Sequence, residues 1–297
     1  SVGPSLLRCA RDMRVVVRQE PMDRTALAWW AALGAGLGLV LLSTLLWVKQ
    51  GSPDDETQAF STELARIEPV LLQLHRGELP TADALDQTRA GEFEPLMRAL
   101  IDASRQRQQA LQAYQAQVEV VSLGDWLTPG HLASSRGREA LRHRLGQLEG
   151  ALDELIKREA VVQSQLNEGM SAWLSRQPGA VQADGALGRL LQASRPASHV
   201  MTSFFKVERD IVIRVADLLD RLDQPEVRVS VELQPQPELV FQREEDLAHY
   251  RRVLGELSAL GEREMQLIDA ARRAPEQQAK LVGAWLVAST DERDWRR

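Results

Sequence analysis

Histidines and carboxylates are the side chains in this sequence that could do chemistry, but their spacing argues against it. Glu139 precedes His143 by four positions, and Glu245 and Asp246 precede His249. A di-iron helical bundle needs two Glu-x-x-His motifs and two further glutamates facing one core, and the sequence has no copy of that motif. We interpret both groups as ordinary surface pairs, and we expect no metal site and no cofactor.

Motifs for nucleophilic or phosphate chemistry are also missing from the sequence. It contains no GxSxG, no HExxH and no phosphate-binding glycine loop. The paired carboxylates Asp54–Asp55 and Glu244–Glu245 stand at predicted helix starts, where they favour the positive end of the helix dipole. Cys9 is the sole cysteine, which excludes an intramolecular disulfide and a cysteine-based zinc site. We therefore predict a protein without catalytic residues.

Three polar residues stand where the apolar pattern of predicted helices calls for apolar side chains. They are Ser104 and Arg107 in a helix near residues 93–121, and Glu159 in a helix near residues 141–166. One interpretation is that these parts are solvated, or that Arg107 and Glu159 pair and set the register of an αα-hairpin. The other is that they form a partner or ligand surface. We favour the first.

The elements that position these residues are mostly helices. Apolar residues recur at spacings of three and four, which is typical of helices packed against one another. The strictest repeat is Leu141, Leu145, Leu148, Leu152, Leu155, Val162 and Leu166. A turn over residues 123–136 separates the two longest helices, which predicts an antiparallel αα-hairpin. Further helices are expected near residues 186–193, 201–222 and 247–268, and a last one after Pro275.

One short segment has the alternation of a β-strand instead. Its apolar residues are Val227, Val229, Val231 and Leu233. They alternate with polar residues, which indicates a strand with one buried face. A return strand over residues 239–241 would complete a hairpin near residues 226–242. The strand could add to the sheet edge of a partner, or the hairpin could cover one end of the bundle within the chain, which we favour.

The longest apolar run is residues 27–48, which contain no charged side chain. A helix of this length spans about 33 Å, enough for a hydrocarbon core of about 30 Å. We predict a single transmembrane helix, because the run is too long for a signal-peptide core. Trp29, Trp30 and Trp47 fit the aromatic belts at the two membrane interfaces.

Small residues within this run are spaced four apart, which lets another membrane helix approach closely. They are Ala28, Ala31, Ala32, Gly34, Ala35, Gly36 and Gly38. One interpretation is association with itself or with a partner's membrane helix. The other is that Gly and Ala are simply common in membrane helices, and we favour association.

Charge predicts the orientation. Five arginines precede the apolar run, whereas Lys49 is the only basic residue close behind it. By the positive-inside rule the N-terminus is cytoplasmic and the bulk of the chain lies outside. Few lysines among the 36 basic residues suggest a bacterial genome, so the outside is the periplasm beyond the inner membrane. The net charge of −6 argues against nucleic-acid binding.

Together these patterns predict a mainly α protein: a single transmembrane helix, then an elongated antiparallel bundle with a long αα-hairpin and one small β-hairpin. The expected segments are a cytoplasmic piece (1–26), the membrane helix (27–48), a linker (49–58) and helical modules (59–175 and 176–297). We expect a non-catalytic structural, assembly or interaction subunit of a bacterial envelope complex, bound to other membrane or envelope proteins and to itself. The alternative is a ligand-sensing or signal-relay module that works through a partner membrane protein.

Overall fold

The computed structural model of the chain describes residues 91–176, 186–233 and 237–294, with a few isolated positions between 66 and 86. Side chains of residues 174, 186–198 and 272–294 are not described. The predicted membrane helix, with its small residues and tryptophans, and the linker behind it lie outside these ranges. Within the described part of the chain, every helix lacks the uninterrupted apolar length that a membrane crossing requires.

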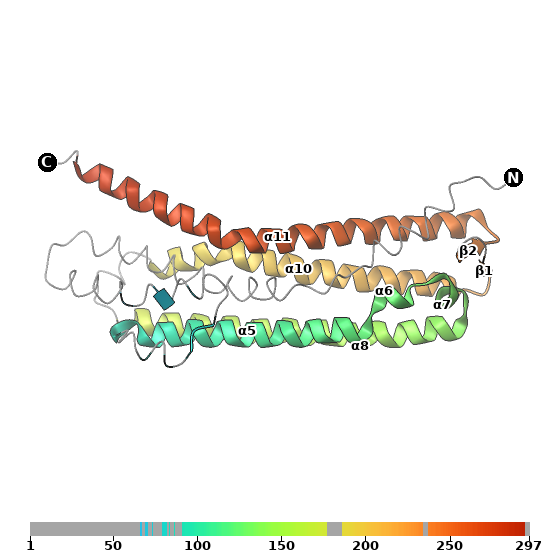
Figure 1. Cartoon of the computed structure of the whole chain (residues 1–297), viewed down its shortest axis with the longest axis horizontal. Helices are drawn as coiled ribbons and strands as arrows, with labels where there is room; N and C mark the ends of the chain where they lie inside the picture. Colours follow the sequence, from blue (N-terminus) through green and yellow to red (C-terminus); the bar gives the residue numbers. More distant parts are fainter. Residues whose placement is uncertain are drawn as a thin grey trace. The chain divides into compact units, whose positions relative to one another are not determined.

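Long helices dominate the described residues, which confirms the mainly α prediction (Figure 1). The four long ones are α5 (Glu94–Val121), α8 (Ser135–Leu174), α10 (Ala186–Leu222) and α11 (Glu244–Asp294). Three short ones are η1 (Gly91–Phe93), α6 (Leu123–Trp126) and α7 (Pro129–Ala133). The prediction of a helical bundle is also confirmed.

The chain forms two compact units, and the long helices contribute to both. Of the described residues, unit 1 contains 113–156 and 202–267, and unit 2 contains 91–112, 157–201 and 268–294 outside the gap. The boundary suggested by the sequence near residue 175 does not separate these units, because each unit draws on both sides of it. Residues far apart in sequence therefore pack together within one unit.

The core of unit 1 is built from the apolar seams of its helices. The buried positions include Leu141, Leu145, Leu148, Leu152 and Leu155 of α8, Val215, Leu218, Leu219 and Leu222 of α10, and Val253 and Leu257 of α11. Their spacing puts each set on one face of its helix. Ion pairs join Arg142 to Asp220 and Asp153 to Arg209. Residue numbers rise along α8 as they fall along α10, so these helices are antiparallel.

Unit 2 packs α5 closely against the second part of α8. Phe93 stacks on Trp173 with ring centroids 5.5 Å apart, and both side chains are buried. Farther along, a Cβ on Gly169 would lie 3.0 Å from the Cβ of Ala99. The glycine therefore lets the two antiparallel helices approach closely at this level.

The predicted hairpin forms within the chain. Strand β1 (Val229–Glu232) pairs antiparallel with β2 (Glu238–Phe241) in a two-stranded sheet, with Ser230 opposite Val240. Figure 1 places the hairpin between the end of α10 and the start of α11. Leu239 is buried, and the ring of Phe241 lies 5.3 Å from that of Tyr250 on α11. Helix α7 packs against both strands.

The helices differ from the sequence prediction where prolines and glycines suggested breaks. Residues 186–222 form one helix, and α11 continues through Pro275 to Asp294. A proline removes one helical hydrogen bond. The other hydrogen bonds of such a long helix remain, so the helix continues past the proline. The segment expected to be a turn contains α6 and α7. Pro129 is the first residue of α7, where its missing N–H costs no hydrogen bond.

Candidate functional site

In unit 2, Arg107 and Glu159 lie in contact across α5 and α8. The guanidinium donates to both carboxylate oxygens of Glu159 at 2.7–3.0 Å, and to Oε1 of Gln163 at 2.9 Å. The side chain of Arg107 is only 6% exposed, so it depends on these acceptors. The prediction that this pair sets the helix register stays a prediction. Ser104 is also buried, and its hydroxyl has no hydrogen-bond partner among the described residues.

In unit 1, three polar side chains from three helices meet, and two of them are buried. The Tyr114 hydroxyl of α5 donates a 2.6 Å hydrogen bond to Oε2 of Glu208 on α10. The carboxyl groups of Glu208 and Glu264, the latter on α11, hydrogen-bond to each other. Glu208 is 2% exposed, whereas Glu264 is half-buried. We call Tyr114, Glu208 and Glu264 the acid cluster.

The electrostatics of the acid cluster favour a retained proton. Burial raises the pKa of Glu208, although the hydrogen bonds from Tyr114 and Glu264 act to lower it. Burial and the neighbouring Glu208 raise the pKa of Glu264 to about 9. Burial and Glu208 also hold the pKa of Tyr114 well above its ordinary value. Two carboxyls this close cannot both ionise without strong repulsion, so at neutral pH the pair holds one proton.

Among the described residues, no hydrogen bond or ion pair joins a basic side chain to the acid cluster. At this level α8 contributes Asp153, which accepts from Arg209 of α10, the residue next to Glu208. The described residues contain no group of three His, Cys, Asp or Glu side chains placed to hold a metal ion. The cluster can therefore hold or release a proton, and this is the chemistry that its geometry supports.

Sequence reasoning missed both glutamates, although a signal was present. Glu208 stands between Phe204 and Ile211 at the three-four spacing of the α10 seam. Glu264 follows Leu257 by seven residues and precedes Leu267 by three. A carboxylate at a seam position is the same signal that drew attention to Glu159.

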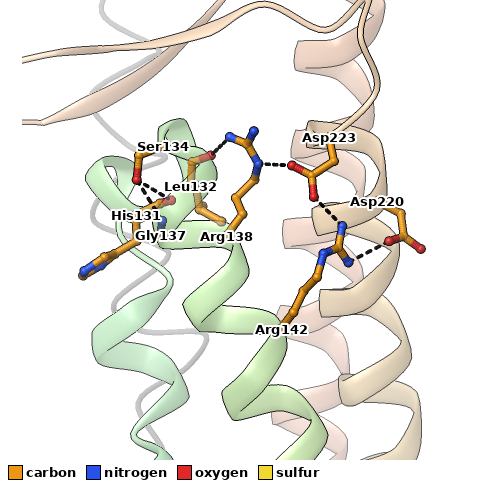
Figure 2. A network of polar contacts seen from close by, with 8 residues as sticks. All are labelled: His131, Leu132, Ser134, Gly137, Arg138, Arg142, Asp220 and Asp223. Atoms are coloured by element: carbon orange, nitrogen blue, oxygen red, sulfur yellow. Dashed lines mark hydrogen bonds and ion pairs between the residues drawn. The ribbon is translucent and has the colours of Figure 1, made fainter.

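A second polar network joins the start of α8 to the end of α10 (Figure 2). Arg138 donates to the carbonyl of Leu132, at 2.8 Å, and to Asp223. Arg142 donates to Asp220 at 2.7 Å and to Asp223 at 2.6 Å. Partial burial acts to raise the pKa of Asp223, but hydrogen bonds from Arg142 and Arg138 lower it below its ordinary value. The network therefore ties the segment around α7 to α10.

Gly137 makes the turn from α7 into α8 feasible. Its N–H donates to Oγ of Ser134 at 3.0 Å, an N-cap interaction that Figure 2 includes. A Cβ at Gly137 would lie 2.3 Å from the carbonyl oxygen of His131. Only glycine fits there without a backbone shift, and α7 is held close to α8 as a result.

Aromatic stacking fixes the other side of α7. The His131 ring stacks on Trp126 with centroids 4.4 Å apart, and the Arg144 guanidinium lies 4.1 Å from the Trp126 centroid. Arg144 also donates to the carbonyl of Val121 at 3.0 Å, at the end of α5. Helix α7 is therefore held by Arg138 and by the stacking of His131 on Trp126, and it packs against the hairpin.

The hairpin exposes its outer face. Val227 is buried and Val229 and Val231 are half-buried, as expected for the inner face, whereas Leu233 is 72% exposed. On the outer face the exposed residues are Arg228, Ser230 and Glu232 of the first strand segment and Val240 of β2. Of the predicted site residues, these strand positions and the pair in unit 2 are the ones that the structure describes.

The interpretation of the histidine groups as surface pairs is wrong for Asp246. This carboxylate is 1% exposed and accepts from Arg221 at 2.7 Å, because it closes the junction between α10 and α11. The neighbouring His249 is partly buried; burial lowers its pKa, helped by Arg252 and Arg221. His143 is exposed and contacts Gln147, at 3.2 Å.

Comparison with protein-family models, curated proteins and solved structures finds no match to this chain.

Proposed function

We propose that this chain is a membrane-anchored, non-catalytic helical protein that acts by protein–protein interaction through the hairpin end of unit 1. The observation that carries the proposal is that helix α7 is held in place by several contacts, whereas the β1–β2 hairpin packed against it exposes its outer face. Arg138, Gly137 and Trp126 fasten α7 and its surroundings, and α7 packs against both strands. The outer face of the ribbon remains exposed. A rigidly supported, exposed strand pair is suited to binding a partner by strand addition.

Two buried ion pairs of the described residues support a structural rather than a catalytic role. Arg107 contacts Glu159, and Arg221 contacts Asp246, so these charges serve contacts between helices. Catalytic constellations instead leave a nucleophile or base facing a substrate site. In both ion pairs the charged groups hydrogen-bond to each other across two helices.

The membrane anchor rests on the apolar run at residues 27–48 and the arginines before it. With this anchor the N-terminus would be cytoplasmic and unit 1 periplasmic, in the inner membrane of a bacterium. An alkaline-phosphatase fusion after residue 297 tests the orientation. We expect an active fusion; an inactive fusion together with a fluorescent cytoplasmic reporter would contradict it.

The interaction surface can be tested with a photo-cross-linking amino acid in the full chain. We expect cross-linked species in native membranes with the probe at Ser230, on the outer face of β1, and none at Glu149, an exposed position of α8. Equal cross-linking at both positions, or none at Ser230, would contradict a specific surface on the hairpin.

The second candidate function is an extracytoplasmic sensing or signal-relay module that works through a partner membrane protein. The acid cluster favours it, because a carboxyl pair that retains a proton makes the packing of three helices depend on pH. If sensing is the function, the activity of the partner should depend on pH, and substitution of Glu264 by Gln should abolish this dependence. A response that is unchanged by this substitution would argue for the interaction subunit alone.

A further inference from the structure

The outer edge of β1 carries backbone groups that have no partner in the described residues. The N–H of Gln242 donates to the carbonyl of Arg228 at 3.2 Å, which identifies these two as a hydrogen-bonded pair of the ladder. Hydrogen-bonded pairs alternate along an antiparallel ladder, so Ser230 and Glu232 also bond toward β2. The N–H and C=O groups of Val229 and Val231 then point away from β2. Neither has a hydrogen-bond partner elsewhere in the described chain.

The charges on this strand match those of a second copy running antiparallel. If two β1 edges meet with Ser230 opposite Ser230 of the partner copy, then Arg228 lies opposite Glu232 on both sides of the centre. In the same register Val229 lies opposite Val231, and these are the residues with free outward N–H and C=O groups. One alignment therefore satisfies both the backbone pattern and the charge pattern.

Within one chain these charges have no such match. Glu232 lies directly opposite Glu238 in the β1–β2 register, and like charges in that position destabilise a sheet. No ion pair in the described residues involves Arg228, Glu232 or Glu238, and Oε1 of Glu238 is buried without a hydrogen-bond partner. An arginine from a second copy would supply the missing positive charge beside the two glutamates.

Helix α7 contacts both β1 and β2. Among the described residues, it makes no hydrogen bond to the backbone of Val229 or Val231, so their outward groups are not taken up by α7. Val227 and Leu239 are buried, so the inner face is the one that packs on the protein. The same register would also place Leu233, exposed in the single chain, opposite Val227 of the other copy.

We propose that two copies of this chain pair through β1 in an antiparallel, two-fold arrangement centred on Ser230, which forms a continuous four-stranded sheet. This inference rests on the proposed function and names its partner as a second copy of the chain. Strands this short bury little surface, and confinement of both chains to one membrane supplies the effective concentration that the pairing needs.

Disulfide trapping tests this pairing in the full chain, with Cys9→Ser as the background and phosphatidylcholine vesicles as the membrane. Residues that face each other in a non-hydrogen-bonded antiparallel pair have Cα atoms about 4.5 Å apart, within the range of a disulfide. We expect Ser230→Cys to form a covalent dimer under mild oxidation. The matched control is Val240→Cys, exposed on the same face and paired with Ser230. Three strand spacings of about 4.8 Å would separate the two control cysteines, which prevents a disulfide.

Charge reversal tests the register. In the Ser230→Cys chain, Arg228→Glu alone or Glu232→Arg alone should slow cross-linking severalfold, because each puts like charges opposite each other. The double variant Arg228→Glu/Glu232→Arg should restore the parent rate. Cross-linking of Ser230→Cys no faster than that of Val240→Cys, or equal rates for all charge variants, would overturn the proposal. The phosphatase fusion reports the membrane anchor separately. Cross-linking of the probe at Ser230 to a different protein, without a disulfide-linked dimer, would overturn the pairing and leave the proposed function standing.

Discussion

The carboxyl groups of Glu208 and Glu264 hydrogen-bond to each other inside unit 1, one from α10 and the other from α11. Tyr114 adds a second donor to Glu208 from α5. Three helices therefore meet at a polar point where Tyr114 and Glu208 are buried and Glu264 is half-buried. A shared proton is what makes this contact favourable, and its loss would leave two negative charges with little water around them.

The acid cluster makes unit 1 less stable as the pH rises. The folded state raises the pKa of Glu264 from 4.5 to about 9, so between these values it binds a proton that the unfolded chain has released. The free energy of unfolding then falls with rising pH across this window, by up to about 1.4 kcal/mol per pH unit for one proton. Glu264→Gln should reduce this slope, because it leaves only Glu208 to titrate, and should be more stable than the parent at pH 8.

Urea denaturation at several pH values measures this difference, with Glu262→Gln as the control, since Glu262 is exposed on the same helix. The control should keep the parent's slope. Parallel stability curves for Glu264→Gln and the parent between pH 5 and 8 would contradict a retained proton.

The contact between Arg107 and Glu159 gives a second prediction. Arg107→Met leaves Glu159 half-buried without its cation, and loss of one partner of a buried pair typically costs about 3–5 kcal/mol. Arg107→Leu combined with Glu159→Leu removes both charges and should recover most of that loss. Thermal unfolding of the single and double variants measures the difference. A double variant as unstable as the single one would mean that packing, and not charge, dominates this position.

Gly137 and Gly146 form a matched pair of glycines on α8. A Cβ at Gly137 would meet the backbone of His131, whereas nothing lies within 4 Å of one at Gly146. We expect Gly137→Ala to destabilise the protein by about 1–3 kcal/mol, the usual range for overpacking. Gly146→Ala should stabilise it by about 0.5–1 kcal/mol, because alanine is the better helix former. Chemical denaturation distinguishes them, and equal effects of the two substitutions would show that the α7–α8 turn adapts.

The small residues of the apolar run give a prediction that lies outside the described residues. If Gly34 and Gly38 form a helix–helix contact, Gly→Ile at both positions should weaken association, because the backbones could no longer approach closely. A membrane-helix dimerisation assay measures this. Unchanged association of the variant, both with itself and with partners, would contradict a helix–helix contact at Gly34 and Gly38.

Periodicity predicted those features that depend on one helix or strand at a time. The seam of Leu141 to Leu166 is buried, and the alternation at Val227 to Leu233 produces the hairpin's first strand. These patterns are local, since three-four and two-residue spacings define a face whatever lies opposite it. The partner of that face is not encoded in the spacing.

For this reason, the seam positions could mark the two glutamates of the acid cluster individually, but their contact with each other and with Tyr114 could not be predicted. Tyr114, Glu208 and Glu264 come from three helices, and each taken alone interrupts or continues an ordinary seam. Helix ends were equally hard to predict, because Pro275 lies within α11 while Pro129 begins α7. A proline marks a missing hydrogen bond, and whether the helix stops there depends on what the rest of the helix gains.

The central claim is that this chain works by association at the hairpin end of unit 1. Extraction of the full chain from native membranes in mild detergent, followed by mass determination of the intact complex, tests it most directly. We expect the parent chain to be recovered in a complex, with itself or with a second protein, and Arg228→Glu to release it. Recovery of the parent as a lone monomer, or a complex that Arg228→Glu leaves intact, would contradict the claim.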